Sequence, residues 1–421
     1  MTRYLNTIAA LAIGTFVVAG CSSKAETDTS SRPNLEISLT NPLTSERTEV
    51  VEVTGFEANS PLAKHAVGIV KVDGKEVEYI DVDGDKQVDK LLVKATFKPE
   101  ETIRLNLAKE KKVPNGVTGL KKTQAEISHK EGGEWNGRKY EGGEFKNVKS
   151  LRVPESHTDH SYYIRYEGPG WENEQIGYRF YLDWRNAIDI FGKKVDTLVL
   201  QNVGQDGFDS YHEPSGWGMD ILKAGKSLGI GSIGQYINGS VAHFEQTDSV
   251  TCSITENNCL ASSITTSYFG WETSAQKADL TSVLNIQSSD RAVKHVVTTN
   301  QALEGFCTGI VKHEKGDRIE SLISSNGWVY LATYGEQSLA EDKLGLAIIF
   351  NTKDVQQVVD GEHDHLLVFK PTTAPITYYL LGAWEQEKNG ITSREKFVSY
   401  LNERVNRLNN PIEVQLNFNG Q

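Results

Sequence analysis

The stretch LASSITTSYFGWETSAQKADLTSVLNIQSSDRAVKHVVTT, residues 260–299, contains three runs in which apolar and polar residues alternate. The runs cover 260–269, 280–288 and 292–299, and short polar segments separate them. Alternation with a period of two is typical of strands that bury one face. Three long runs in succession, with no helical pattern between them, predict a broad antiparallel sheet.

Similar runs on both sides extend this prediction to the whole chain. Five precede residue 110, at 35–40, 49–54, 67–72, 91–97 and 102–107, and six more occur at 176–182, 197–203, 318–331, 344–350, 366–369 and 375–384. We therefore expect an all-β protein, with a small N-terminal β-sandwich over 35–110 and a large antiparallel β-sandwich over 111–421 that carries the candidate site. The Lys- and Gly-rich segment 109–143 is predicted to form turns and a long excursion.

One helix is predicted near the C-terminus. Thr392 and Glu395 have the spacing of a capping box, and Asn410-Pro411 provides a stop signal. Between them, apolar residues recur at helical spacing at Phe397, Val398, Leu401, Val405 and Leu408. Residues 412–418 are predicted to follow the helix as a strand.

The composition restricts the class of protein. An apolar fraction of 38% over 421 residues supports a large core, and it excludes wholesale disorder, a collagen-like fibre and a polytopic membrane protein. The 56 acidic residues outnumber the 44 basic ones, giving a net charge of -12. We therefore expect no nucleic-acid partner, because such binding depends on clustered Lys and Arg.

The first residues are typical of a secreted lipoprotein. Arg3 precedes an apolar run at 8–18, and small residues lead to Cys21. We interpret 1–20 as a lipoprotein signal peptide and 21–34 as a polar tether, with Cys21 as the lipidated residue; the alternative is an ordinary signal with an incidental cysteine. This predicts a lipid-anchored protein of the bacterial cell envelope, in the outer membrane and facing the periplasm or the surface, whose only membrane contact is its N-terminal lipid.

Two further features predict stabilising cross-links. Cys252 and Cys259 are predicted to form a disulfide in an oxidising compartment, leaving Cys307 unpaired. Asp81, Asp83, Asp85 and Asp89 surround a glycine turn and present oxygen ligands suited to a structural Ca²⁺, although a solvated acidic hairpin tip is the alternative. No organic cofactor is expected, because the glycines of 225–234 do not complete a P-loop pattern and have no Rossmann context.

The richest concentration of polar and aromatic residues lies between Arg152 and Lys223. Strand alternation places Arg179, Tyr181 and Asp183 on one face and Tyr178 on the other. A polar face of this kind favours a lined cleft, because such groups are costly to bury, and an internal ion-pair network is the alternative. The candidates in this region are His160, Trp171, Glu172, Asn173, Tyr178, Arg179, Arg185, Tyr211, His212, Trp217, Asp220 and Lys223.

Several strings in this region resemble one family. They are Trp171-Glu172-Asn173, the run from Asp183 to Lys193, Tyr211-His212, and the run from Trp217 to Lys223. On these strings and the Asp81 loop, the chain resembles the envelope proteins known as domain of unknown function 4861, found among genes for polysaccharide use. The resemblance implies a β-sandwich related to the galactose mutarotase supersandwich. Some members resemble a dehydratase that converts the non-reducing-end uronate of ulvan fragments into a 4,5-unsaturated uronate.

That reaction needs three roles, which we assign as hypotheses. A group must offset the charge of the substrate carboxylate, a base must remove H5, and an acid must protonate the departing C4 hydroxyl. We expect Arg179 or Arg185 as the carboxylate clamp, because guanidinium binds carboxylates at two points. His212 or His160 is then the base, and Tyr211 or Tyr178 is the acid.

The remaining candidates would bind the acidic oligosaccharide. Trp171 and Trp217 are expected as sugar platforms, with Glu172, Asn173, Asp220 and Lys223 as further substrate-binding residues. Two alternatives remain open: a glycoside hydrolase with a pair such as Glu172 and Asp220, or a non-catalytic glycan-binding lipoprotein. No feature of the sequence predicts an oligomeric state.

Overall fold

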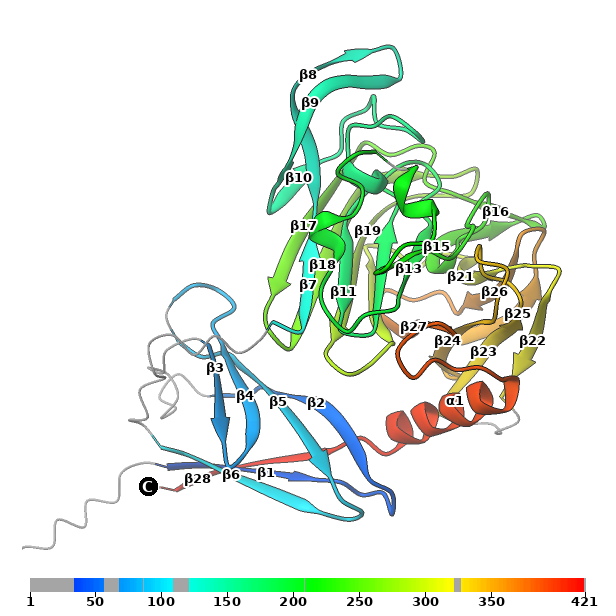
Figure 1. The fold of residues 1–421 in the computed structure, drawn as a ribbon. Coiled ribbons are helices and arrows are strands. Elements are labelled where there is room, and N and C mark those ends of the chain that lie inside the picture. The colour runs from blue at the N-terminus through cyan, green and yellow to red at the C-terminus, as the bar shows by residue number, and fades with distance from the viewer. Residues whose placement is uncertain are drawn as a thin grey trace, which may run out of the picture.

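The computed structural model describes residues 34–56, 68–85, 87–108, 121–207, 209–321 and 327–419. Most of them lie in antiparallel strands, arranged as a small and a large body (Figure 1), so the all-β prediction is confirmed. The predicted signal peptide, most of the tether and Cys21 lie outside the described residues. None of the described helices has the length and apolar character needed to cross a membrane.

The small sandwich consists of two sheets. One has the order β28 (Glu413–Asn419), β1 (Asn34–Thr40) and β6 (Thr102–Ala108), and the other has the order β2 (Arg47–Val53), β5 (Lys90–Phe97), β4 (Lys75–Ile80) and β3 (Gly68–Val72). An apolar core that includes Leu35, Ile37 and Phe97 packs between them.

The chain terminus completes this small sandwich. Ile37 of β1 pairs with Leu416 of β28, so the last strand belongs to the N-terminal unit rather than to the large sandwich. The predicted division at residue 110 therefore missed one strand. Local alternation identifies a strand, but the partner of that strand depends on contacts across nearly the whole chain.

The large body is a sandwich of three sheets around one core. Its nine-stranded sheet has the order β10 (Ser150–Arg152), β17 (Ser249–Asn257), β18 (Ala261–Glu272), β19 (Lys277–Gln287), β20 (Val293–Thr299), β27 (Ile376–Trp384), β24 (Leu344–Asn351), β23 (Trp328–Gly335) and β22 (Gly316–Glu320). The runs at 260–299 thus form neighbouring strands, as predicted.

Two five-stranded sheets pack against the nine-stranded sheet. One is β14 (Gly218–Asp220), β13 (Ile188–Lys193), β12 (Ile176–Phe180), β11 (Gly170–Asn173) and β7 (Thr123–Glu126), and the other is β16 (Ser240–Ala242), β15 (Ile230–Ile237), β21 (Phe306–Val311), β26 (Asp364–Phe369) and β25 (Val355–Asp360). Their inner faces and that of the nine-stranded sheet share a large apolar core. Three short 3-10 turns, η1 (Arg165–Glu167), η2 (Leu200–Asn202) and η3 (Ser210–His212), lie in the connections.

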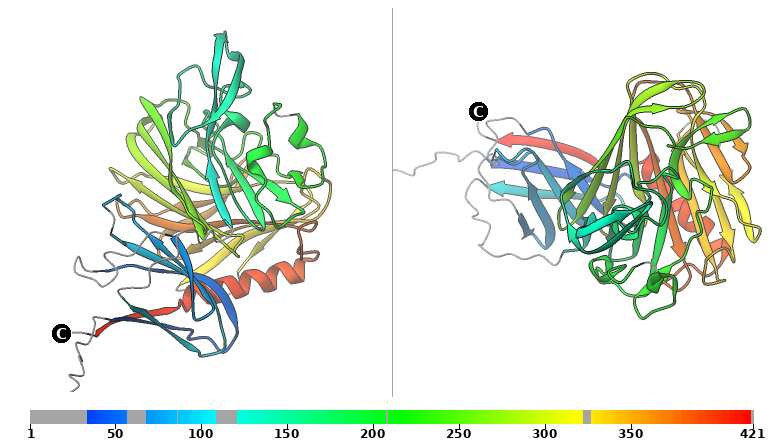
Figure 2. Two further views of the ribbon diagram at one scale, coloured as in Figure 1. Left: turned by 60° about the vertical axis from the view of Figure 1, so that its left-hand side comes forward. Right: turned by 90° about the horizontal axis from the view of Figure 1, so that it is seen from above.

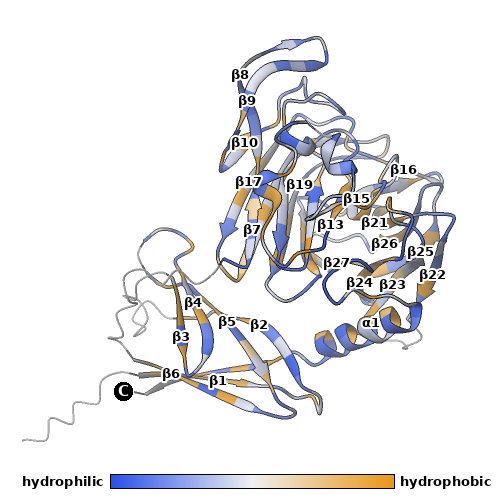
Figure 3. Ribbon diagram, in the orientation of Figure 1, coloured by the Kyte–Doolittle hydropathy of each residue, from blue (hydrophilic) through white to orange (hydrophobic). Residues whose placement is uncertain are grey.

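The predicted helix is α1 (Arg394–Asn409), the one α-helix of the described chain. Its apolar side, visible as orange bands in Figure 3, packs Phe397, Leu401 and Val405 on a face of the nine-stranded sheet. The N-cap is Ser393, whose side chain accepts a hydrogen bond from the Lys396 amide at 3.3 Å. The predicted cap at Thr392 was therefore one residue early, because Ser393 is the residue with extended backbone at the helix start.

Two segments differ from their predicted conformation. Within 109–143, the described part is mainly a projecting hairpin of β8 (Ser128–Asn136) and β9 (Lys139–Asn147), at the top of Figure 1. The run at 197–203 forms η2 instead of a strand, because the buried Arg165 guanidinium donates to the carbonyls of Leu200, Gln201 and Val203 at 3.0–3.2 Å.

The predicted disulfide is wrong, since no disulfide joins Cys252 to Cys259. Cys252 lies within β17, and five residues of extended strand separate it from the end at Asn257. At about 3.3 Å per residue the two cysteines lie roughly 16 Å or more apart, whereas a disulfide requires Cα atoms within about 7 Å. Cys307 is also free and is buried, as expected.

Cys259 lies instead at the contact between the two bodies, which are seen from two further directions in Figure 2. The Glu78 carboxylate on β4 accepts hydrogen bonds from the amides of Cys259 and Leu260 at 2.7 and 2.8 Å. Leu260 also packs against apolar residues of the small sandwich, including Ile80. The small sandwich is therefore anchored directly to the end of β17.

We predict acid sensitivity from a histidine in the core of the large body. Burial lowers the pKa of His295 to about 4, and its ring nitrogens contact Ser282 Oγ at 2.7 Å and the Gly231 carbonyl at 3.2 Å. Between pH 6.5 and pH 4 the unfolded chain binds a proton that the folded chain does not, so acidification through this window lowers stability by up to about 3 kcal/mol. In urea titrations, His295→Gln should lose less stability over this window than wild type. Equal losses in both proteins would contradict the assignment.

Candidate functional site

The outer face of the sheet that contains β12 carries buried charges. On β12, Tyr178 and Phe180 point into the apolar core, whereas Arg179 lies on the opposite face, as the alternation predicted. Strand pairing places Asp189 of β13 opposite Arg179, and Asp220 of β14 opposite Phe191. Three neighbouring strands thus bring one guanidinium and two carboxylates together.

Arg179 is the centre of this group, with only 3% of its surface exposed. Its guanidinium donates to Asp189 Oδ2 at 2.8 Å, to Asp220 Oδ2 at 2.5 Å and to the Tyr211 hydroxyl at 2.8 Å. Tyr181 also donates to Asp189, at 2.5 Å. The donors of Arg179 are therefore used within the protein, and they hold residues from three strands and η3 in fixed positions.

Arg185 forms a second centre beside the first. Its guanidinium contacts Asp183 at 2.5 Å and both Asp159 and Glu167 at 3.0 Å. The Tyr181 ring lies close to both arginines, with its centroid 4.9 Å from Arg179 and 4.0 Å from Arg185. The two guanidinium groups therefore belong to one continuous assembly.

Two half-exposed imidazoles lie at the ends of this assembly. His212 Nε2 lies 3.2 Å from Asp220 Oδ2, and its side chain is 42% exposed. His160 Nδ1 lies 2.5 Å from Asp159 Oδ1, and its side chain is 52% exposed. We call the whole set the charge cluster: Asp159, His160, Glu167, Arg179, Tyr181, Asp183, Arg185, Asp189, Tyr211, His212 and Asp220.

The pKa values of two carboxylates show how strongly the groups interact. Burial raises the pKa of Glu167, but the positive charges of Arg185 and Arg179 outweigh it and hold that pKa at about 2. Burial and the neighbouring Asp220 raise the pKa of Asp189 to about 6, although Arg179 opposes the change. The nearby arginines thus lower the pKa of Glu167, whereas burial and a neighbouring carboxylate raise the pKa of Asp189, and perturbed pKa values of this kind are common at functional sites.

The backbone around the charge cluster is strained. Positive φ angles occur at the non-glycine residues His160 (58°), Tyr162 (61°), Tyr166 (38°), Glu167 (71°) and Asn186 (51°). Each such residue costs on the order of 1–3 kcal/mol, and this kind of strain concentrates at active sites and ligand-binding sites. The backbone at Gly168 packs closely against the end of β12. A Cβ atom at this position would lie 1.7 Å from the Phe180 carbonyl oxygen, so only glycine fits there.

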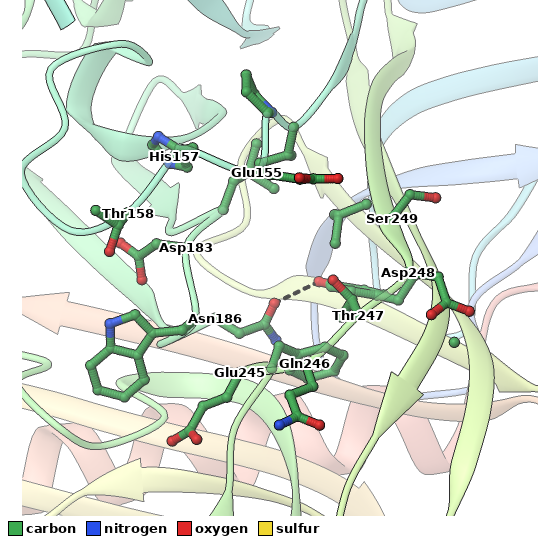
Figure 4. Close-up of a pocket in the computed structure, with 18 of the residues that line it drawn as sticks. Glu155, His157, Thr158, Asp183, Asn186, Glu245, Gln246, Thr247, Asp248 and Ser249 are labelled. Atoms are coloured by element: carbon green, nitrogen blue, oxygen red, sulfur yellow. Dashed lines mark hydrogen bonds between the residues drawn. The ribbon is translucent and has the colours of Figure 1, made fainter. Parts of the chain in front are cut away.

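A cavity of 980 Å³ adjoins the charge cluster (Figure 4). His157 and Asp183 belong to its wall, and Asp183 connects it to Arg185. The Nδ1 atom of His157 forms a hydrogen bond of 2.8 Å with Ser161 Oγ. Its buried Nε2 atom has no hydrogen-bond partner among the described residues. The lining also includes Trp184, which is 36% exposed. We call this space the Trp184 cavity.

The Trp184 cavity is rich in carboxylates. Besides Asp183, its acidic lining residues are Glu155, Glu245, Asp248 and Glu272, and its basic ones are Arg152 and His157. In Figure 4, Glu155 lies in the upper part of the view and Glu245 in the lower part. A large, polar cavity with an exposed indole is suited to a sugar, whose hydroxyl groups bind carboxylates and whose ring faces stack on aromatic side chains.

The structure brings together about half of the residues expected at the site. His160, Arg179, Arg185, Tyr211, His212 and Asp220 all belong to the charge cluster. Trp217 lies nearby, half-buried with its ring 6.0 Å from that of Phe191. Lys223 is exposed and lines a different cavity.

Four expected residues are core residues. Trp171 and Tyr178 are fully buried with stacked rings 5.6 Å apart, and the Tyr178 hydroxyl donates to the Arg291 carbonyl. Glu172 is buried against Lys193 at 2.6 Å, and Asn173 donates to the carbonyls of Gln287 and Asp290. Burial therefore removes Trp171 as a platform, Tyr178 as the acid, Asn173 as a sugar contact and Glu172 as a hydrolytic carboxylate.

Several members of the site were not among the sequence-based candidates. Asp159, Glu167, Tyr181, Asp183 and Asp189 complete the charge cluster. The sequence held evidence for three of them. Tyr181 and Asp183 alternate with Arg179 along the chain, and Asp189 lies opposite Arg179 on the next strand, β13. The exposure of Trp184 had no comparable signal in the sequence.

Two groups of side chains have the composition of a metal site. Ligand atoms of Asp81, Asp83 and Asp89, between β4 and β5, lie within 4.8 Å of one another, whereas Asp85 is not part of that group. The calcium prediction fits these oxygen donors and stays a prediction. Asp159, His160 and Glu167 also lie within 4.8 Å, but Arg185 already provides a cation between the two carboxylates.

Comparisons with known proteins identify a family but assign no activity. The model of the family described as Domain of unknown function (DUF4861) matches residues 39–414. No curated protein matches the chain in sequence.

Two similar solved structures come from Enterococcus faecalis: an alpha-mannosidase from strain V583 (13% identity) and a protein in the Glycosyl Hydrolase Family 38 (11% identity). Each has a TM-score of 0.42 and covers 91% of this chain, which spans only 46% and 47% of their lengths. Similarities this distant establish neither the fold nor the reaction of this chain.

We predict that Arg179 stabilises the whole charge cluster. Arg179→Met would leave Asp189 and Asp220 buried without their cation, which should lower the free energy of unfolding by about 3–5 kcal/mol. Arg318→Met provides the control, because Arg318 on the edge strand β22 also pairs with two carboxylates, but these are more than half exposed, and such pairs contribute about 0–1 kcal/mol. Chemical unfolding of both variants tests this, and equal stability losses would contradict it.

Proposed function

The chain belongs to the DUF4861 family, and we propose that it is a carbohydrate-active enzyme that removes water from the terminal uronate of acidic oligosaccharides. One observation carries the proposal: two half-exposed imidazoles, His212 and His160, are each held by a carboxylate at the ends of one buried charge cluster. An elimination needs a base and an acid, and the cluster supplies one half-exposed imidazole for each role.

In the proposed reaction, His212 removes H5 of the uronate. The electron pair of the C5–H bond forms the C4=C5 double bond, and the C4–O bond breaks. His160 supplies a proton to the departing hydroxyl, which leaves as water. Asp220 and Asp159 orient the two imidazoles and stabilise their positive forms, as a carboxylate does for histidine in other acid–base sites.

The two arginines act as positioning residues in this scheme. The sequence suggested that Arg179 or Arg185 clamps the substrate carboxylate, but their donors are bound to the protein's own carboxylates. Tyr211 is also a positioning residue, because it is only 2% exposed, its hydroxyl accepts from Arg179, and its ring lies 4.7 Å from that of His212. The role of acid therefore passes to His160.

The Trp184 cavity, whose lining includes neither His212 nor His160, is the proposed site for the sugar residues that follow the terminal uronate. It shares Asp183 with the charge cluster and presents an exposed indole. The predicted lipid anchor at Cys21 would place this cavity outside the cytoplasm, where polysaccharide fragments are encountered.

A glycoside hydrolase is the second candidate, and the carboxylates of the Trp184 cavity favour it. Hydrolysis uses two carboxyl groups on either side of the glycosidic bond. The pair expected from the sequence is excluded by the burial of Glu172, but Glu155 and Glu245 both line the cavity. A purely glycan-binding protein would need neither the paired imidazoles nor the strained backbone beside them.

The three functions give different products. Incubation with uronate-ended oligosaccharides, followed by mass spectrometry, should show loss of one water and a product that absorbs in the ultraviolet. New reducing ends would support the hydrolase instead. Binding without any product would leave only the glycan-binding function.

We predict that His212→Ala and His160→Ala each lower kcat by about 100-fold or more, as loss of a general acid or base does. His365→Ala is the matched control, because His365 on β26 also contacts a carboxylate, Asp360, at 2.6 Å. Rates of unsaturated product formation test the prediction. Either variant with the activity of the control would remove that histidine from the mechanism.

A further inference from the structure

A second cavity of 290 Å³ has the opposite charge from the Trp184 cavity. Its basic lining residues are Lys223, Lys226, Lys312, His313 and His363, and its one carboxylate is Glu362. We call it the Lys223 cavity. The chain as a whole has a net charge of -12, whereas this cavity contains three lysines and one acid and is therefore locally positive.

Two of the lysines have no partner within the described part of the chain. Lys312 donates to the Gly361 carbonyl at 2.7 Å, but the ammonium groups of Lys223 and Lys226 make no hydrogen bond or ion pair to a described residue. Some exposed lysines are paired with acids, such as Lys343 with Glu336 at 3.0 Å, whereas Lys223 and Lys226 both line one cavity without such a partner among the described residues. Unpaired cations around one cavity repel each other, and a bound anion would relieve that repulsion.

The backbone of the Lys223 cavity is held in place before any ligand binds. The Ser227 hydroxyl donates to the Ala224 carbonyl at 2.6 Å and accepts from the Gly229 amide at 2.9 Å. The Leu228 amide donates to the buried Asp364 carboxylate at 3.0 Å, and the Leu339 amide donates to the Ile221 carbonyl at 3.0 Å. The lysines therefore project from a fixed segment, which lowers the entropic cost of binding.

His243 connects a backbone segment beside the Trp184 cavity to one that lines the Lys223 cavity. One ring nitrogen of His243 contacts the Arg185 carbonyl at 2.9 Å, and the other contacts the Lys226 carbonyl at 3.1 Å. The same ring lies edge-on to Trp184, with centroids 5.8 Å apart. A sugar chain that passes over Trp184 and His243 would therefore run toward the segment that carries Lys223 and Lys226.

We infer that the Lys223 cavity binds an anionic group, a sulfate ester or a carboxylate, on a sugar residue of the glycan that occupies the Trp184 cavity. This inference rests on the proposed function for the identity of the glycan, but anion binding by the cavity is independent of catalysis. The cavity selects anionic glycans by recognising a charge remote from the reacting uronate. It also gives Lys223 a substrate-binding role outside the charge cluster.

Calorimetric titration with inorganic sulfate and with acetate tests the anion site directly. The dissociation constant of the preferred anion should rise about tenfold or more in Lys223→Ala/Lys226→Ala, and stay unchanged in Lys71→Ala/Lys98→Ala, which removes the same charge from the small sandwich. Sulfate binding alone identifies a sulfate ester as the ligand, and comparable acetate binding identifies a carboxylate. Absence of binding to wild type, or equal binding by both double variants, overturns the inference.

Kinetics with an oligosaccharide that carries the preferred anionic group test its role with the glycan. The Lys223→Ala/Lys226→Ala protein should show a KM raised about tenfold with kcat within about twofold of wild type, because the contact is remote from the reacting bonds. An unchanged KM overturns the role in glycan binding. Failure of the proposed function would appear differently, as absence of product from wild type despite sulfate or acetate binding.

Discussion

The burial of Arg179 and Arg185 beside β12 and β13 is the constraint on which the site depends. A guanidinium removed from water needs carboxylate partners, and these two have five: Asp159, Glu167, Asp183, Asp189 and Asp220. The partners come from strands and connections distant in sequence, so the ion pairs fix several segments at once. The strained backbone at His160 and Glu167 persists because these contacts determine it. His160 and His212 reach solvent from positions that the buried charges set.

The sequence predicted much of the local structure, because local patterns reflect which face of an element is buried. Alternation identified the strands of 260–299 and the opposite orientations of Tyr178 and Arg179, and helical spacing identified α1. Local patterns could not show which segments of the chain lie next to each other in the fold. The pairing of β28 with β1, the role of Arg165 in converting 197–203 into η2, and the position of Cys259 all depend on residues far away in the chain.

For the site, the sequence identified the right region but not the exposure of each residue. Trp171, Glu172 and Asn173 belong to the strings that resemble the family, yet the structure uses them to build the core and the strand connections. Residues of one polar face were predictable as a group. Which tryptophan is exposed depends on packing around β11 and β12. The structure exposes Trp184 and buries Trp171. The two cavities, one acidic and one basic, could not be predicted from local sequence patterns either, because their lining residues come from distant segments.

The proposed reaction begins when the protein removes a proton from C5 of a uronate, and a deuterium label at that carbon follows this step. A uronate-ended oligosaccharide carrying deuterium at C5 should give an unsaturated product without the label, and should react more slowly than the unlabelled sugar if proton removal limits the rate. A product that retains deuterium at C5, formed by cleavage of the glycosidic bond, would contradict the elimination and favour hydrolysis by the carboxylates of the Trp184 cavity.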